Sequence, residues 1–272
     1  MTGANDWQLQ ISEAQLATMT RDLDEAHRES FPVMQAQATL FAEELADNAP
    51  RERRLGRRGF LLGAGGVGAA FALAACSSSG SNPQAAGTGG MGSPSAMGSA
   101  SGSGQYTGDL QVVALATALE NQAVGAYTAA IAAATAGKLG TVPPAVSTFA
   151  TTVKSQHADH AKAWNAVLTA ANVPAITGVP LSNQPQVLSA LGAVTTVGGL
   201  ANLALDLENQ AAETYLFAEG NVSSAGGIAT AASIAPVESM HAAILLFILG
   251  QYPVPDAFLG TSKAASPSLL TV

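Results

Sequence analysis

The sequence lacks most of what disulfide-rich and nucleic-acid-binding proteins depend on. It has one cysteine, Cys76, in 272 residues, which excludes an intramolecular disulfide. Every arginine lies in residues 1–76, and beyond them four lysines face nine aspartates and glutamates, a net charge of 4 − 9 = −5. A weakly acidic segment without arginine is a poor partner for nucleic acid, because phosphate binding needs clustered basic side chains. We therefore predict no nucleic-acid partner.

The apolar and polar alternation of β-strands is also absent, and long stretches rich in Ala and Leu have helical character instead. Glycines and prolines divide them into four long predicted helices and a shorter one: 110–136, 145–171, 185–193, 198–218 and 227–249. The long connection after residue 171 indicates a crossover from one end of a bundle to the other. The sequence therefore predicts an all-α fold, a four-helix bundle in residues 106–272.

Residues 57–76 resemble an export signal. Arg57-Arg58 before Gly-Phe-Leu resembles a twin-arginine (Tat) signal, and Leu-Ala-Ala-Cys76 resembles a lipoprotein lipobox. The 16-residue apolar run between them is shorter than the roughly 20 residues that span a bilayer as a helix. These features predict use of the Tat translocase, cleavage before Cys76 and a lipid on its sulfur. The protein would then be exported and lipid-anchored at the extracytoplasmic face of the cell membrane. The alternative is an uncleaved N-terminal anchor with a buried cysteine.

The chain on either side of this signal is of two kinds. Residues 1–50 are long and acidic, with apolar residues at roughly helical spacing: Ile11, Leu16, Met19 and Leu23. They form a short cytoplasmic helix that cleavage removes, or translation starts at Met34. Residues 77–105 are mostly Ser, Gly, Ala, Pro and Met, which predicts a flexible linker. The predicted organisation is a cytoplasmic n-region with signal peptide (1–76), a linker (77–105) and the bundle (106–272).

The phrase Leu-Glu-Asn-Gln-Ala occurs twice, at 119–123 and 207–211, and an x-x-His segment follows each copy. This order would let two helical hairpins bring metal ligands to a common centre. The glutamates occupy apolar helical surroundings, where a buried carboxylate must be paired, protonated or bound to a metal. Carboxylate oxygen with imidazole nitrogen suits iron or manganese. The predicted metal ligands are Glu120, His157, His160, Glu208, Glu238 and His241.

Residues 110–250 resemble the ferritin-like superfamily, specifically the exported bacterial ferritin-like domain proteins. The resemblance lies in the Leu-Glu-Asn-Gln-Ala phrases, in Ala-Pro-Val-Glu-x-x-His at 235–241 and in Tyr-Pro-Val-Pro-Asp-Ala-Phe at 252–258. It implies a di-iron centre with two carboxylates from single positions (Glu120, Glu208), one bridging carboxylate (Glu238) and two terminal imidazoles (His160, His241).

One position departs from that pattern. His157 stands where the first x-x-His motif should begin with Glu, so the set has three carboxylates and three imidazoles. Three carboxylates leave about +1 on two ferrous ions, which should weaken the second metal or favour an added hydroxide or anion. The predicted function is a di-metal protein, of iron or alternatively manganese, with ferroxidase or peroxide-consuming activity. The alternative is a structural or interaction lipoprotein with a degenerate, non-catalytic site.

Tyr127 and Tyr215 are predicted to pack in the core with a hydroxyl reaching a polar partner, and Trp164 to pack beside the site.

Overall fold

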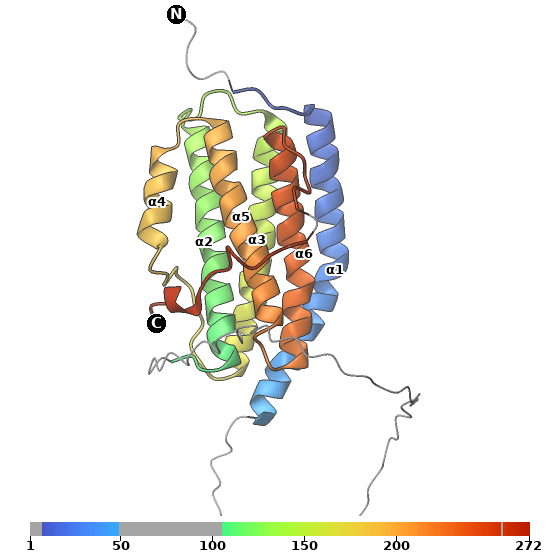
Figure 1. Ribbon diagram of the computed structural model, residues 1–272, viewed down its shortest axis with the longest axis vertical. Helices are drawn as coiled ribbons and strands as arrows, with labels where there is room; N and C mark the ends of the chain where they lie inside the picture. The colour runs from blue at the N-terminus through green and yellow to red at the C-terminus, as the bar shows by residue number, and fades with distance from the viewer. Residues whose placement is uncertain (1–6, 49–104, 257) are drawn as a thin grey trace, which may run out of the picture. The chain divides into compact units, whose positions relative to one another are not determined.

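The computed structural model describes residues 7–48, 105–256 and 258–272 (Figure 1). Cys76, Arg57 and Arg58 lie outside the described residues, as does nearly all of the predicted linker. The elements are α1 (Glu13–Asn48), α2 (Asp109–Thr135), α3 (Pro144–Ala170), α4 (Gln184–Ala193), α5 (Val197–Glu219), α6 (Ala225–Ile248) and the 3-10 helix η1 (Pro267–Leu269). The all-α prediction is confirmed, and the five helices predicted after residue 105 agree with α2 to α6 to within two residues.

Helices α2, α3, α5 and α6 form the predicted four-helix bundle. Helix α2 pairs with α3 and helix α5 pairs with α6. The predicted crossover follows α3 and runs along the bundle to the start of α5, carrying α4 against α2 and α5 (Figure 1). Each helix of the second pair begins with a side-chain cap. Thr196 accepts a hydrogen bond from the Gly199 N–H at the start of α5, and Ser224 accepts one from the Gly227 N–H at the start of α6.

Helix α1 is the main difference from the sequence prediction. Where a short helix was expected, the structure has 36 residues that pack along α3 and α6. One compact unit contains α1 together with the bundle. Its buried side chains recur at intervals of three, four or seven residues on one face: Leu16, Thr20, Leu23, His27, Met34, Ala38 and Phe41. Such a stripe is what holds an amphipathic helix against a core.

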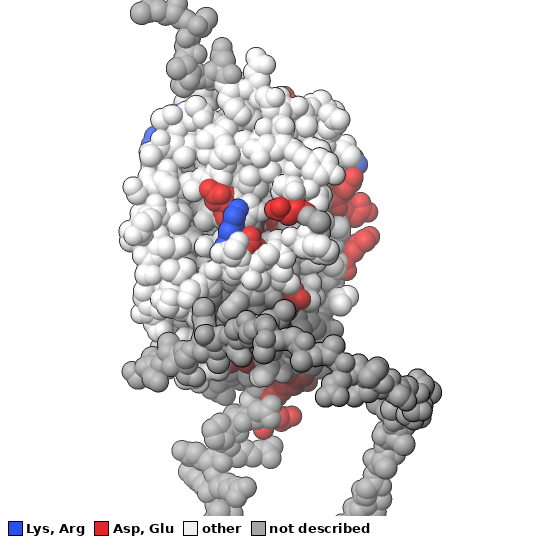
Figure 2. Space-filling view, viewed as in Figure 1, with Lys and Arg blue, Asp and Glu red and all other residues white. Residues whose placement is uncertain are grey.

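The outer face of α1 carries most of the helix's charge. Eight acidic and two basic residues occur in Glu13–Asn48. Figure 2 shows acidic side chains along the edge of the molecule formed by α1, with few charged side chains over the rest of the visible surface. The helix therefore presents an acidic surface to solvent while its apolar stripe faces the bundle.

A close contact between α1 and α6 depends on glycine. A Cβ added at Gly226 would lie 2.7 Å from the backbone nitrogen of Phe41 and 2.9 Å from its Cα. Backbone atoms cannot move aside cheaply, so any larger residue at 226 would push α1 away from α6. Phe41 itself is fully buried. The start of α6 is thus shaped to receive α1.

Two groups of buried apolar side chains lie at different levels of the bundle. One includes Leu115, Trp164, Leu168, Tyr215 and Ile234. The other includes Leu16, Tyr127, Phe149, Val153, Leu205 and Leu245. Along each bundle helix, the predicted ligands fall between residues of these two groups. Helix α6 is long and apolar enough to cross a membrane, yet most of its most apolar stretch is buried in the bundle, as in a core helix.

Candidate metal centre

The structure brings all six predicted ligands together in the middle of the bundle. Each is at most 2% exposed. Their ligand atoms form two overlapping groups, Glu120-His157-His160-Glu238 and His157-Glu208-Glu238-His241, and within each group the atoms lie within 4.8 Å of one another. Two residues, His157 and Glu238, belong to both groups. Four helices thus supply donors to two adjacent positions, each of which could bind a metal ion.

His157 lies at the centre of this cluster. Its Nδ1 is 2.7 Å from Glu120 Oε2 and its Nε2 is 3.2 Å from Glu208 Oε1. The imidazole therefore connects the two glutamates of the repeated phrase. Glu238 is also near, with Oε2 at 3.7 Å from His157 Nδ1. The residue that departs from the family pattern occupies the space between the two candidate metal positions.

Some contacts have the geometry of converging ligands rather than of hydrogen bonds. His160 Nδ1 and Glu238 Oε1 are 3.0 Å apart, yet both atoms are buried without a hydrogen bond. Orphaned buried polar atoms are costly and need an explanation. A cation between an imidazole nitrogen and a carboxylate oxygen would satisfy both. The donor set present therefore fits a metal ion.

Without a metal, protons on the imidazoles compensate the carboxylates. Burial alone would lower the pKa of His160, but the Glu120 and Glu238 carboxylates outweigh it and raise the pKa to about 9. Burial would raise the pKa of Glu120, yet His160 and His157 lower it to about 2. Nearby carboxylates likewise outweigh burial at His157 and His241, whose pKa values are raised. At neutral pH the metal-free centre thus carries anionic Glu120 and Glu208 carboxylates and cationic imidazoles.

The two tyrosines are paired crosswise with the glutamates. Tyr127, on the same helix as Glu120, donates its hydroxyl to Glu208 at 2.5 Å. Tyr215, on the same helix as Glu208, donates to Glu120. Each hydroxyl thus reaches a polar partner, and that partner is a predicted ligand on the opposite helix. The tyrosines therefore fix the orientation of the two carboxylates.

Trp164 makes the two halves of the site unequal. Its indole N–H donates to the Tyr215 hydroxyl at 2.9 Å, extending the chain of hydrogen bonds that ends on Glu120. The corresponding position on α6, four residues after His241, is Leu245, which has no hydrogen-bonding group. The contact with Tyr215 places Trp164 beside the site, as predicted.

Gln156 is a site residue that sequence reasoning missed. Its Oε1 accepts a hydrogen bond from His241 Nε2 at 2.8 Å, and the side chain is 2% exposed. The bond places a proton of His241 on Nε2 and directs Nδ1 toward Glu208 and Glu238, at 3.2 and 3.1 Å. Partners of this kind orient metal-binding imidazoles. A lone Gln next to a predicted ligand carries no sequence signal.

His27 was also missed. It lies on α1, is 4% exposed, and its ring centroid is 5.3 Å from that of His160. Burial and the positive charges of His160 and His241 lower the pKa of His27 to about 4, so it is neutral at pH 7. The signal that could have found it is its place in the apolar stripe, seven residues before Met34 and four after Leu23.

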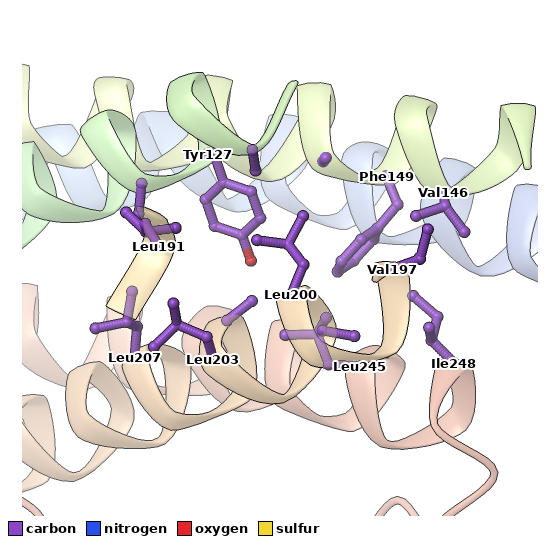
Figure 3. A pocket seen from close by; sticks show the side chains of 15 residues that line it. Tyr127, Val146, Phe149, Leu191, Val197, Leu200, Leu203, Leu207, Leu245 and Ile248 are labelled. Atoms are coloured by element: carbon purple, nitrogen blue, oxygen red, sulfur yellow. The ribbon is translucent and has the colours of Figure 1, made fainter. Parts of the chain in front are cut away.

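An apolar cavity of about 50 Å³ lies beside the centre. Figure 3 shows the Tyr127 ring projecting into it between side chains of α2, α3, α5 and α6, with Leu191 of α4 at one side. Among its lining residues, the Tyr127 hydroxyl is the one side-chain polar group. Its apolar lining suits small apolar molecules.

Comparison with known proteins identifies the bundle. Residues 108–251, slightly more than half of the chain, match the family model described as a ferritin-like domain. No curated protein matches the chain, and no solved structure does. The family match contains all six clustered side chains and both tyrosines and ends at residue 251, whereas α1 lies before it. The chain belongs to the ferritin-like domain family.

Proposed function

We propose that this chain is an exported, lipid-anchored ferritin-like protein that binds two metal ions, iron in the first place and manganese as the alternative, and that it oxidises Fe(II) with O2 or peroxide. The observation that supports this most is the pair of overlapping donor groups at one buried centre. Carboxylate oxygen and imidazole nitrogen suit these metals. Two bound iron ions would supply the electrons and the open coordination positions that reduction of an oxidant requires.

The protein's own residues would prepare the centre for this chemistry. Tyr127 and Tyr215 hold the carboxylates of Glu208 and Glu120, and Gln156 orients His241. Burial of every ligand excludes bulk water, which strengthens each electrostatic interaction in the site. The cavity beside Tyr127 would concentrate O2, an apolar molecule, next to the centre.

Export and anchoring rest on sequence features. The Arg57-Arg58 pair, the apolar run and Cys76 support passage through the Tat translocase and lipidation at the outer face of the cell membrane. Cleavage before Cys76 would break the covalent connection between α1 and the bundle. Mass spectrometry of the membrane fraction tests the proposal, which requires a chain beginning at lipidated Cys76. Recovery of an intact chain with a free thiol would contradict it.

Metal analysis of the full chain tests the proposed centre. The wild type and a His160→Ala, His241→Ala double variant are loaded with Fe(II) anaerobically, desalted and measured. We expect up to two metals per wild-type chain and a strong loss in the variant. Less than roughly 0.2 metal per wild-type chain, well below one bound ion, would contradict the proposal. Exposure of the loaded protein to O2, followed optically, then tests for oxidation.

A second function has a specific observation in its favour. His157 occupies the space between the two glutamates and contacts both, so a protonated imidazole could itself offset part of their charge. The centre would then be a structural element of a cell-envelope interaction lipoprotein. This function predicts a wild type that is folded and stable without metal and that fails to oxidise Fe(II).

A further inference from the structure

The bundle helices that carry the histidines are the ones that α1 covers. His157 and His160 are on α3, His241 is on α6, and α1 packs against these two helices. The ferritin-like match begins at residue 108, so α1 is an addition to the family domain. Its contact with α6 at Gly226 is too close for any side chain. An extra helix fitted this closely over the ligand-bearing face raises the question of what it contributes to the centre.

His27 is a buried polar side chain of α1 whose ring lies against that of one predicted ligand, His160. It is 96% buried, and its Nε2 has no hydrogen-bond partner. An unpartnered nitrogen in the core costs free energy unless a ligand satisfies it. Apolar packing accounts for one side of the His27 ring, which stacks on Phe31 with centroids 5.1 Å apart. The ring also lies against His160.

The spacing of the His27 and His160 rings matches that of one histidine pair within the predicted site. The His27 and His160 centroids are 5.3 Å apart with planes at 52°. The His157 and His241 centroids, whose nitrogens belong to one donor group, are 5.2 Å apart with planes at 61°. Two imidazoles that bind one metal ion lie at such a distance, since each nitrogen is about 2.1 Å from the ion. A neutral imidazole has one N–H and one free lone pair.

We propose that α1 is the fifth helix of the metal centre and that His27 is a further imidazole ligand on its His160 side. Metal binding and docking of α1 would then stabilise each other, because the metal joins α1 to α3 and α6. The inference rests on the proposed metal-binding function. It places a nitrogen donor beside the Glu120-His157-His160-Glu238 group, whose mutually close ligand atoms do not include those of His27, and makes residues 13–48 part of the site.

The test uses Co(II), whose visible spectrum responds to the number and kind of its ligands. His27→Phe keeps an aromatic ring against Phe31 and removes both nitrogens, and His27→Gln keeps a polar group. We expect both full-length variants to bind Co(II) roughly 10- to 100-fold more weakly than the wild type and to change its spectrum. Hydrogen exchange of residues 13–48 should slow on adding Co(II) to the wild type and stay unchanged in His27→Phe.

Substitutions at two glycines distinguish the docking of α1 from metal ligation by His27. Gly226→Leu pushes α1 away at Phe41 without touching His27, whereas a Cβ at Gly125 on α2 meets nothing within 4 Å. Co(II) binding should weaken in Gly226→Leu and remain at the wild-type level in Gly125→Leu.

The outcomes distinguish this inference from the function on which it rests. A wild type that binds no Co(II) overturns both. A wild type that binds Co(II), beside a folded His27→Phe with the same affinity and spectrum, overturns the role of His27 alone. In that case His27 only packs, and His27→Phe should be more stable than the wild type because it removes an unsatisfied nitrogen. If His27→Phe does not fold, His27→Gln decides by the same measurements.

Discussion

Metal binding should release protons from the centre, and the structure indicates how many. The pKa of His160 is about 9 in the metal-free protein, so at pH 7 about 99% of this imidazole is protonated. A metal must displace that proton, which at about two pH units below the pKa costs about 3 kcal/mol, or roughly 100-fold in affinity. His157 and His241 also have raised pKa values. The pKa of Glu120 is about 2 and that of Glu208 is also lowered, by His157 and His241 against the effect of burial. Glu120 and Glu208 therefore have no proton to release.

The logarithm of the Mn(II) association constant should accordingly rise with pH between pH 6 and 8, with a slope between one and three. Isothermal titration calorimetry in buffers of different ionisation enthalpy counts the released protons directly. Mn(II) is used in place of Fe(II) because it does not oxidise during the titration. The His160→Ala variant should release fewer protons per bound metal. A slope of zero over this range would refute the proposed protonation of the metal-free centre, and with it the view that protons and metal compete for the same imidazoles.

Further predictions concern stability, stoichiometry, orientation and access. The raised pKa of His160 stabilises the metal-free protein by up to about 3 kcal/mol below pH 6.5, the ordinary pKa of histidine, and this contribution is lost as the pH rises through 9. The Tm of the metal-free protein should therefore fall from pH 6.5 to 9. A constant Tm over this range would be inconsistent with the raised pKa. His157→Glu restores a fourth carboxylate and should strengthen binding of the second metal, measured as a rise in metals per chain at limiting Mn(II); unchanged stoichiometry would show that charge does not limit the second position. Gln156→Leu removes the acceptor of the His241 N–H and should weaken metal binding roughly 10- to 100-fold with little change of fold by circular dichroism, whereas equal affinity would exclude an orienting role. Ala130→Leu fills the cavity beside Tyr127 and should slow reaction of the Fe(II)-loaded protein with O2 at unchanged metal content; an equal rate would mean that O2 enters elsewhere.

The bundle and its ligands could be predicted because their signals are local or repeated. Glu120 and Glu208 occur in an identical phrase, and glycines and prolines mark the helix ends, so register and boundaries followed from spacing alone. The six side chains were identifiable because a buried carboxylate or imidazole in an apolar helix needs a partner. Their convergence in the structure reflects the symmetry of the two helical pairs.

What sequence reasoning missed depends on packing between distant segments. The stripe of α1 was recognised only as far as Leu23, because acidic residues and Pro32 interrupt the sequence before Met34 and Phe41. Nothing local shows that α3 and α6 leave a face for this helix, and Gly226 gains meaning only when Phe41 lies against it. The orienting role of Gln156 likewise requires knowing which nitrogen of His241 faces away from the carboxylates.

The position of α1 along the chain has a consequence for where the protein can exist in this form. Helix α1 precedes the twin-arginine pair, and the bundle follows it. During export by such a signal, the residues before it stay in the cytoplasm while those after it cross. The bilayer would then divide Phe41 from Gly226, which touch in the structure. Under the proposed export route, the five-helix form is therefore the cytoplasmic precursor. Translocation would separate α1 from the bundle and expose, outside the cell, the surface of α3 and α6 that α1 covers.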